Sequence, residues 1–281
     1  MSRNVDIRRI SDGAPQGAIT FDATIGGAPV SPTAIAVSYL KDELYVGLYA
    51  ESLGLGAVLR IPLDGSARDY LVSPTGNLSQ PWMPRQLVVE QDTGDLFIRA
   101  SGEKRLWVAR ATGGSLEASP EVCDFAAMAL KLGRMFVACR EVSGATSLVK
   151  ALSTSDLSVF SGGIPISGRP TAIAHDNERD LTYVASDSVD GALHYITRFS
   201  FGTYQIFPLP SSGAALAADS VAGDVYVAFS TANKVYVPDF SVSTPTPKRE
   251  YLDVGSYPQA IVAVAVNTVE PSDFIFQSGF E

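Results

Sequence analysis

The fold is decided by a stretch in the middle of the sequence, PTAIAHDNERDLTYVASD, at residues 170–187. It joins a short apolar segment, residues 172–175, to a second one, residues 182–184, through a polar turn. Aromatic and β-branched residues such as Tyr183 and Val184 favour packed β-strands. The stretch therefore predicts a β-hairpin, and the rest of the chain repeats it.

The first half of this hairpin recurs six times along the chain. The copies are Ala34–Val37, Gln86–Val89, Ala127–Leu130, Ala172–His175, Ala215–Ala218 and Ala260–Ala263. Their spacings are 52, 41, 45, 43 and 45 residues. Four copies follow a proline, which suits the first residue of a strand because its missing N–H breaks no ladder; these are Pro32, Pro84, Pro170 and Pro258.

A second strand follows each copy after a turn. These strands are Leu44–Val46, Leu96–Ile98, Met135–Val137, Thr182–Val184, Val225–Val227 and Phe274–Phe276, and hairpin turns are expected at Thr93-Gly94, Leu132-Gly133 and Ala222-Gly223. Third strands are expected at Ala57–Pro62, Arg105–Arg110, Ser147–Leu152, Ala192–Phe199 and Lys234–Val237. Fourth strands are expected at Arg68–Val72, Leu157–Phe160, Tyr204–Phe207 and Arg249–Val254.

Four strands in each period of about 45 residues are typical of β-propeller blades. The sixth copy is followed by only two strands, and the missing pair is found at the other end of the chain. Residues 5–13 are similar to residues 58–65, and Ala18–Asp22 has the pattern of a fourth strand. We therefore predict one all-β domain, residues 1–281. It is a six-bladed propeller whose last blade takes its third and fourth strands from the N-terminus and its first and second from the C-terminus.

The segment Val225–Val237 resembles a YVTN repeat, and the whole pattern resembles the six-bladed class of NHL-repeat, YVTN-repeat and lactonase-like proteins. The resemblance implies a fold that hosts both enzymes and pure interaction modules. Lactonase-type members bind a divalent metal over the channel, and its first ligand lies in a Glu-Gly-Pro stretch at an inner strand. Here no Glu occupies the equivalent positions, which read Pro32-Thr33, Pro84-Arg85, Pro170-Thr171 and Pro258-Gln259.

Composition excludes several other classes of function. The chain is 46% hydrophobic and 18% charged, and its two His and two Cys cannot build a zinc ribbon or a three-His zinc site. A net charge of -9 without a basic run argues against nucleic acid and acidic membrane surfaces as partners. No apolar stretch is long enough for a membrane span. We expect a monomer with a small-molecule or protein ligand.

The two ends of the sequence bear on the cellular compartment. Residues 1–6 carry no apolar signal core. The tail, residues 273–281, resembles a short terminal pattern that closes many exported proteins of Gram-negative bacteria. We expect an extracytoplasmic protein, secreted or periplasmic, whose signal peptide is absent from this sequence; a cytoplasmic protein is the alternative.

One hairpin departs from the others near the propeller axis. The first residue of each inner strand faces the residue just after the second strand, and four of the six pairs consist of small residues only. The pairs are Ala34/Gly47, Gln86/Arg99, Ala127/Ala138, Ala172/Ala185, Ala215/Ala228 and Ala260/Gln277. Crowding at the axis explains the small residues, so the large polar pair Gln86/Arg99 marks a candidate site.

Further polar residues are expected near this pair. Arg85 is adjacent, Trp82 precedes it in the longest interval between repeats, and Arg140 and Arg169 fall on the same rim. Arginine can hold a carboxylate or phosphate bidentately and Trp can stack on a ring, so we predict a site for a small anionic or sugar-like ligand or a protein partner. In the alternative, Arg99 ties to the neighbouring blade and Trp82 is a packing lid.

The remaining candidates concern metal binding and catalysis. Asp187 and Asp190 lie in a loop on the same rim and could bind calcium or supply a general acid, as part of a metal-dependent lactonase-like hydrolase or lyase. The turn at residues 176–180 could also bind calcium. No other cofactor is predicted. His175 aligns with Val37 and is expected to be a core residue, and His194 is expected within a third strand.

The two cysteines leave one question open. If Lys131 pairs with Arg134, then Cys139 faces Ala126, three residues from Cys123. Three residues of strand span about 10 Å, whereas a disulfide joins Cα atoms less than about 7 Å apart. A bridge therefore requires the chain to fold back.

Overall fold

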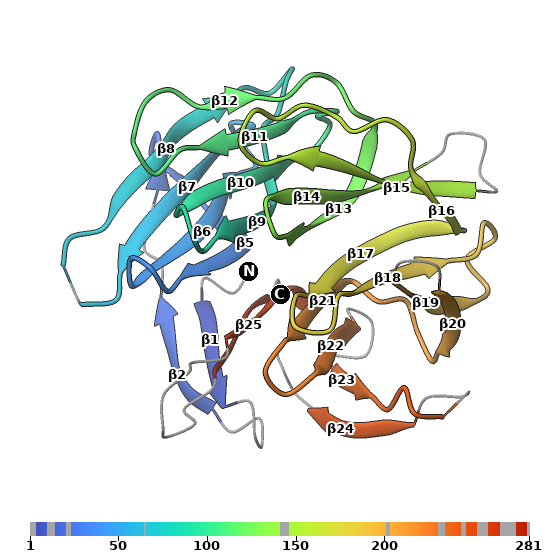
Figure 1. The fold of residues 1–281 in the computed structure, drawn as a ribbon. Coiled ribbons are helices and arrows are strands. Elements are labelled where there is room, and N and C mark those ends of the chain that lie inside the picture. The colour runs from blue at the N-terminus through green and yellow to red at the C-terminus, as the bar shows by residue number, and fades with distance from the viewer. Residues whose placement is uncertain are drawn as a thin grey trace.

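The chain folds into four-stranded antiparallel sheets arranged around a central axis, as Figure 1 shows. This computed structural model describes residues 4–9, 15–20, 24–64, 66–140, 146–200, 203–229, 234–242, 246–251, 258–264 and 274–279. Within these ranges the regular elements are all β-strands, and no helix there could cross a membrane. The predicted all-β propeller with four antiparallel strands per blade is thus confirmed.

Five sheets, here called blades one to five, are each built from four consecutive strands. Blade one contains β5 (Ser31–Ser38), β6 (Glu43–Ala50), β7 (Leu55–Pro62) and β8 (Asp69–Gly76). Blade two contains β9 (Pro84–Glu90), β10 (Asp95–Ala100), β11 (Leu106–Ala109) and β12 (Glu117–Ala118). Blade three contains β13 (Asp124–Lys131), β14 (Arg134–Arg140), β15 (Thr146–Ser153) and β16 (Ile164–Ser167).

Blade four contains β17 (Arg169–Asp176), β18 (Leu181–Asp187), β19 (His194–Ser200) and β20 (Thr203–Leu209). Blade five contains β21 (Ala215–Asp219), β22 (Asp224–Phe229), β23 (Lys234–Pro238) and β24 (Pro247–Tyr251). The first strand of each blade is its inner strand and lines the axis (Figure 1). A small hairpin of β3 (Thr24–Ile25) and β4 (Ala28–Pro29) precedes blade one.

The two ends of the chain share a further four-stranded sheet, here called the terminal sheet. Its order is β2 (Pro15–Thr20), β1 (Asn4–Arg9), β26 (Phe274–Gly279) and β25 (Pro258–Val264). The strands follow the order predicted for the closing blade. Five blades are contiguous in sequence, and the predicted count of six is reached only if the terminal sheet is counted with them.

The predicted hairpin registers are confirmed in blades one to five, where the inner pairs are Ala34↔Gly47, Gln86↔Arg99, Ala127↔Ala138, Ala172↔Ala185 and Ala215↔Ala228. The terminal sheet differs by one residue. Ala260 pairs with Ser278 and not with Gln277, and this register continues unchanged to Val264↔Phe274. Crowding explains the small pairs: a Cβ added at Gly47 would lie 2.9 Å from the Cβ of Pro84 in blade two.

One predicted fourth strand is wrong. Residues 157–160 lie in the connection after β15 and form only an isolated bridge, Leu152↔Val159. The outer strand of blade three is β16, which pairs with β15 from Thr146↔Ser167 to Val149↔Ile164. An outer strand pairs with a neighbour on one edge only and is more exposed to solvent. Its sequence pattern is therefore weak, and its position is easily misplaced.

The core lies between neighbouring blades, which pack face to face. One cluster joins Tyr45 and Val58 of blade one to Leu87 and Ile98 of blade two. Equivalent clusters join blades two and three, three and four, and four and five. Each sheet buries both faces of its inner strands, which explains their nearly continuous apolar composition.

Candidate functional site

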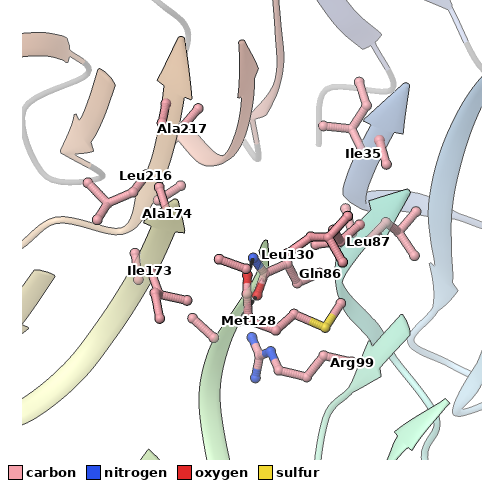
Figure 2. Close-up of a pocket in the computed structure, with 18 of the residues that line it drawn as sticks. Ile35, Gln86, Leu87, Arg99, Met128, Leu130, Ile173, Ala174, Leu216 and Ala217 are labelled. Carbon is pink, nitrogen blue, oxygen red and sulfur yellow. Dashed lines mark hydrogen bonds between the residues drawn. The ribbon is translucent and has the colours of Figure 1, made fainter. Parts of the chain in front are cut away.

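A cavity of about 310 Å³ follows the axis between the inner strands of the five blades. The second residue of each repeat lines it (Figure 2); these are Ile35, Leu87, Met128, Ile173 and Leu216. Alanines fill most of the positions beside them. The exceptions to this apolar and small lining are polar residues contributed mainly by blade two, Arg85, Gln86, Gln91 and Arg99.

Gln86 bridges blade two to blade three. Its Nε2 donates to the carbonyl of Met128 at 2.6 Å, and its Oε1 accepts from the Met128 N–H at 2.7 Å. The side-chain amide therefore pairs with the free edge of β13 as another peptide group would. We call this pair of hydrogen bonds a clip, and it already occupies the Gln86 amide.

Gln91 forms a second clip of the same kind, and this residue was not among those predicted from the sequence. Its Nε2 donates to the carbonyl of Val37 at 2.8 Å, and its Oε1 accepts from the N–H of Tyr39 at 2.9 Å. The available signal was its position five residues after Gln86, just beyond the same inner strand. Blade two thus holds the strand edges of both neighbours.

Arg99 keeps part of its hydrogen-bonding capacity unused. One Nη donates to the carbonyl of Phe125 in blade three at 3.2 Å, whereas the buried Nε has no hydrogen-bond partner among the described residues. Burial, together with the charges of Arg140 and Arg85, lowers the pKa of Arg99 to about 10. The group is charged at neutral pH, and Figure 2 shows its guanidinium directed into the cavity.

Arg85, Arg99 and Arg140 form one basic cluster, here called the arginine mouth, where the inner strands of blades two and three begin. Arg85 and Arg99 line the cavity. Arg140 is exposed and is the strand partner of Asp124. Asp124 is the acid whose charge acts on Arg99. No ion pair joins any of the three arginines to an acid of the described ranges. Within the described residues, the charges that act on Arg99 are therefore two arginines and one carboxylate.

Trp82 lies elsewhere than the sequence predicted. It is only 4% exposed and packs in the core cluster between blades one and two, away from the cavity lining. The space for it comes from Gly56 and Gly76, where an added Cβ would lie 1.9 Å from the Trp82 carbonyl oxygen and 2.7 Å from its nitrogen. The expectation of a Trp stacked on a ligand is corrected to a packing lid between blades.

Arg169 and Asp187 belong to blade four, where they are strand partners. Arg169 is exposed and is not among the residues that line the cavity. Asp187 accepts a hydrogen bond from Ser212 at 2.8 Å, and its other oxygen lies 2.8 Å from Nδ1 of His194. The alignment placed Arg169 on the same rim, but the structure does not bring it into the arginine mouth.

Asp190 organises its own loop. It accepts hydrogen bonds from the Ser188 hydroxyl and the Ala192 N–H, and the Ser188 bond is the main cause of its lowered pKa. Nowhere in the described part of the chain do three or more His, Cys, Asp or Glu side chains converge as metal ligands would. The proposed calcium ligands Asp187 and Asp190 therefore serve other partners in this structure.

The turn after β17 is tied together by Asp176. Its buried carboxylate accepts hydrogen bonds from the N–H groups of Glu178 and Arg179 and from the Arg179 side chain. His175 lies in the core, 8% exposed, with Nδ1 2.9 Å from the Thr182 hydroxyl. The prediction of a core histidine is confirmed, and the turn has a structural explanation without calcium.

Cys123 and Cys139 form a disulfide, with their Cα atoms 5.7 Å apart. The register explains how they meet. Lys131 pairs with Arg134 as expected, but a bulge inserts Ala126, so Cys139 faces Phe125 and lies nearer to Cys123. A bulge adds one residue to one strand and bends it, and this supplies the fold-back that the sequence analysis required.

The sequence matches no protein-family profile, and no curated protein is detectably similar to it. Solved structures are similar in fold. A chain of a nidogen/laminin complex has a TM-score of 0.64 and 10% identity, covering 89% of this chain and 93% of that one. Hydrazine synthase of Kuenenia stuttgartiensis has a TM-score of 0.63 and 11% identity, covering 92% and 83%.

Hsv2 of Kluyveromyces lactis is more distant, with a TM-score of 0.50 and 8% identity over 80% of this chain and 64% of that one. Identities this low show the fold and nothing of the activity. The resemblance to the NHL, YVTN and lactonase-like class stays a prediction. What the comparisons support is that the chain has the fold of a β-propeller.

Proposed function

We propose that the protein is a binding module that holds a small anionic ligand at the arginine mouth. The observation that carries the proposal is that Arg85, Arg99 and Arg140 lie next to a cavity and form no ion pair with the described residues. A guanidinium in a partly desolvated site that forms no ion pair gains more from an incoming carboxylate or phosphate than an exposed one does. We further infer that the terminal sheet serves as the sixth blade of the ring.

The ligand chemistry is that of a carboxylate or phosphate. An acidic sugar and the C-terminus of a peptide both present a carboxylate, so both fit the same mouth. The apolar cavity wall behind the arginines accepts the body of such a ligand.

The test is a calorimetric titration at low salt with inorganic phosphate, galacturonate and a short peptide, in its free-acid and C-terminally amidated forms. We expect saturable binding of at least one anion, and Arg99→Met weakens it at least tenfold. If the peptide is the ligand, amidation abolishes its binding.

Arg105→Met is the matched control, because Arg105 is exposed and pairs with Glu121 at 3.9 Å on the surface. It should leave the affinity unchanged. The proposal fails if none of the probes binds, or if Arg105→Met weakens binding as much as Arg99→Met does.

We also propose that the protein works outside the cytoplasm. Disulfides persist in oxidising compartments and are rare in the cytosol, so the Cys123–Cys139 bridge supports this location. Protein directed to a bacterial periplasm should contain no free thiol in a thiol titration. Protein that keeps two free thiols there would contradict the proposal.

A further inference from the structure

A second and larger cavity, of about 500 Å³, lies between blades three and four. It is separate from the axial cavity, and the two share none of their lining residues. It is lined by the ends of β13 and β14, by the connection before β16 and by β19 and β20, which come from the two adjacent sheets of Figure 1. Its volume is within the range of small-molecule sites. We call it the outer groove.

Aromatic rings form the walls of the outer groove. Phe136 and Phe160 belong to blade three, and Phe199 and Tyr204 belong to blade four. Phe160 and Tyr204 are 42% and 44% exposed, although aromatic side chains of this size usually bury more of their surface. The groove thus offers apolar ring surface to solvent from both of its sides.

Two cations in the outer groove, Arg134 and Lys150, form no ion pair with an acid of the described residues. Arg134 is exposed, and its guanidinium carbon lies 4.9 Å from the centre of the Phe160 ring. No acid of the described residues forms an ion pair with it. Lys131 is paired with Asp180, and the Lys150 amine donates to the carbonyl of Val122 at 3.2 Å. Among the described residues, Arg134 is therefore the groove cation whose donor groups remain available, because the Lys150 amine is held by a backbone carbonyl.

The stacked position of Arg134 prepares it for one kind of partner. A guanidinium that stacks on a ring uses its face for the cation–π contact and keeps its in-plane N–H groups available. Those N–H groups match a carboxylate or sulfonate bidentately. An apolar or aromatic body attached to that acid would lie along the ring walls.

We propose that the outer groove binds a small molecule with an aromatic or other apolar body and a single acid group, held by Arg134 and Phe160. The inference rests on the shape, rings and charge of this groove. It is independent of the anion site at the arginine mouth, because the two cavities share no lining residue.

The test uses two fluorescent probes, the sulfonate 1-anilinonaphthalene-8-sulfonate and the neutral N-phenyl-1-naphthylamine. We expect saturable binding of the sulfonate to the folded protein. Arg134→Met should weaken the sulfonate at least tenfold and change the neutral probe less than twofold, because only the charge contact is lost. Phe160→Ala should weaken both probes.

Arg198→Met is the matched control. Arg198 stacks on Phe207 at 5.0 Å within blade four but does not line the outer groove. It should leave both affinities unchanged. Arg99→Met should also leave them unchanged, which separates this proposal from the one at the arginine mouth.

Three results would overturn the proposal: no saturable sulfonate binding, equal losses from Arg134→Met and Arg198→Met, or sulfonate binding that is lost in Arg99→Met. Circular dichroism of each variant shows that it is folded. Arg134 is exposed, so its replacement should not prevent folding, and Arg134→Lys provides a second variant. It keeps the charge without the fork and should bind the sulfonate with intermediate affinity.

Discussion

In the four-residue repeat of their inner strands, blades two and four each place one polar side chain among apolar or small ones. Gln86 of blade two reaches across to the backbone of Met128 in blade three. His175 of blade four stays within its own hairpin, bonded to Thr182, and lies edge-on to Phe136 of blade three with ring centroids 6.0 Å apart. Gln86 thus joins two blades through hydrogen bonds, whereas His175 only fills space between two blades.

The difference lies in what each side chain can satisfy. The Gln86 amide has one donor and one acceptor matched to a peptide group, and neither titrates. His175 leaves its buried Nε2 without a hydrogen bond, 3.8 Å from Asp180. The contact made by Gln86 should therefore hold at any pH, whereas the one made by His175 depends on the imidazole remaining neutral.

The largest loss of stability is expected on replacing Arg110 of blade two, which we compare with Arg179 of blade four. Arg110 binds Asp95 of its own blade and the carbonyls of Thr154 and Ser155 in blade three. Its loss leaves the largely buried Asp95 without a counter-ion and with only the Ala111 N–H as a donor among the described residues, so Arg110→Ala should lower the free energy of unfolding by about 3 kcal/mol, measured by urea denaturation.

The control for Arg110 is Arg179 of blade four, which makes the analogous contacts to Asp176 and to the carbonyl of Ser220. Arg179 is more exposed, and backbone N–H groups still satisfy Asp176, so Arg179→Ala should cost about 1 kcal/mol or less. Equal losses in the two variants would show that burial does not distinguish the blades.

The next effect concerns the strand that receives the contacts of Gln86 and Arg99. The disulfide fixes the start of blade three and closes a loop with a sequence separation of 16. Replacing both Cys123 and Cys139 by Ser should cost about 3 kcal/mol through the entropy of the unfolded chain. Thermal unfolding under oxidising and reducing conditions checks this, because only the wild type should respond to reduction.

A smaller effect separates the two glutamine clips of blade two. Gln86→Ala leaves the N–H and C=O of Met128 unpaired in a partly buried place and should cost about 2 kcal/mol. Gln91→Ala frees groups closer to solvent, so about 1 kcal/mol is expected. Urea denaturation of the two variants gives the order, and a larger loss at Gln91 would contradict the assigned role of Gln86.

The smallest effect is the pH dependence of blade four. Burial and the charge of Lys131 lower the pKa of His175 to about 4, below the unfolded value of 6.5. The unfolded chain therefore binds a proton first as the pH falls, and stability is lost from about pH 6.5 downward. Between pH 7 and pH 5 the loss should be between about 1 and 2 kcal/mol.

His175→Gln should remove that part of the pH dependence of unfolding. His194→Gln is the control for the substitution itself, because it makes the same exchange at a partly exposed histidine beside Asp187. If His175→Gln retains the full wild-type difference, the titrating group is another residue.

The sequence was sufficient for the hairpins of blades one to five. Alternation along a strand fixes its register, because a slip of one residue would turn every apolar side chain outward. Bulges leave no such mark, and for this reason the meeting of Cys123 and Cys139 was undecided. The fourth strand of blade three was misplaced because its pattern is weak.

The sequence singled out Gln86 and Arg99 by their size among alanines, and the structure places both, with Arg85, on the wall of the axial cavity. That they form a binding site stays a prediction. Their partners in blade three depend on how neighbouring sheets are placed, which no local pattern records. Trp82 was assigned to a rim loop because the need for Gly56 and Gly76 as its packing space shows only in three dimensions.

The terminal sheet has a consequence for how the protein is made. Val5, in the first strand, pairs with Ser278 in the last. During synthesis β1 therefore emerges long before its partner, while blades one to five can each form from consecutive strands as they appear. Pairings this distant in sequence form slowly, and unpaired strand edges attract other chains until they close. We therefore expect the pairing of β26 with β1 to be the last step of folding and the step most exposed to aggregation.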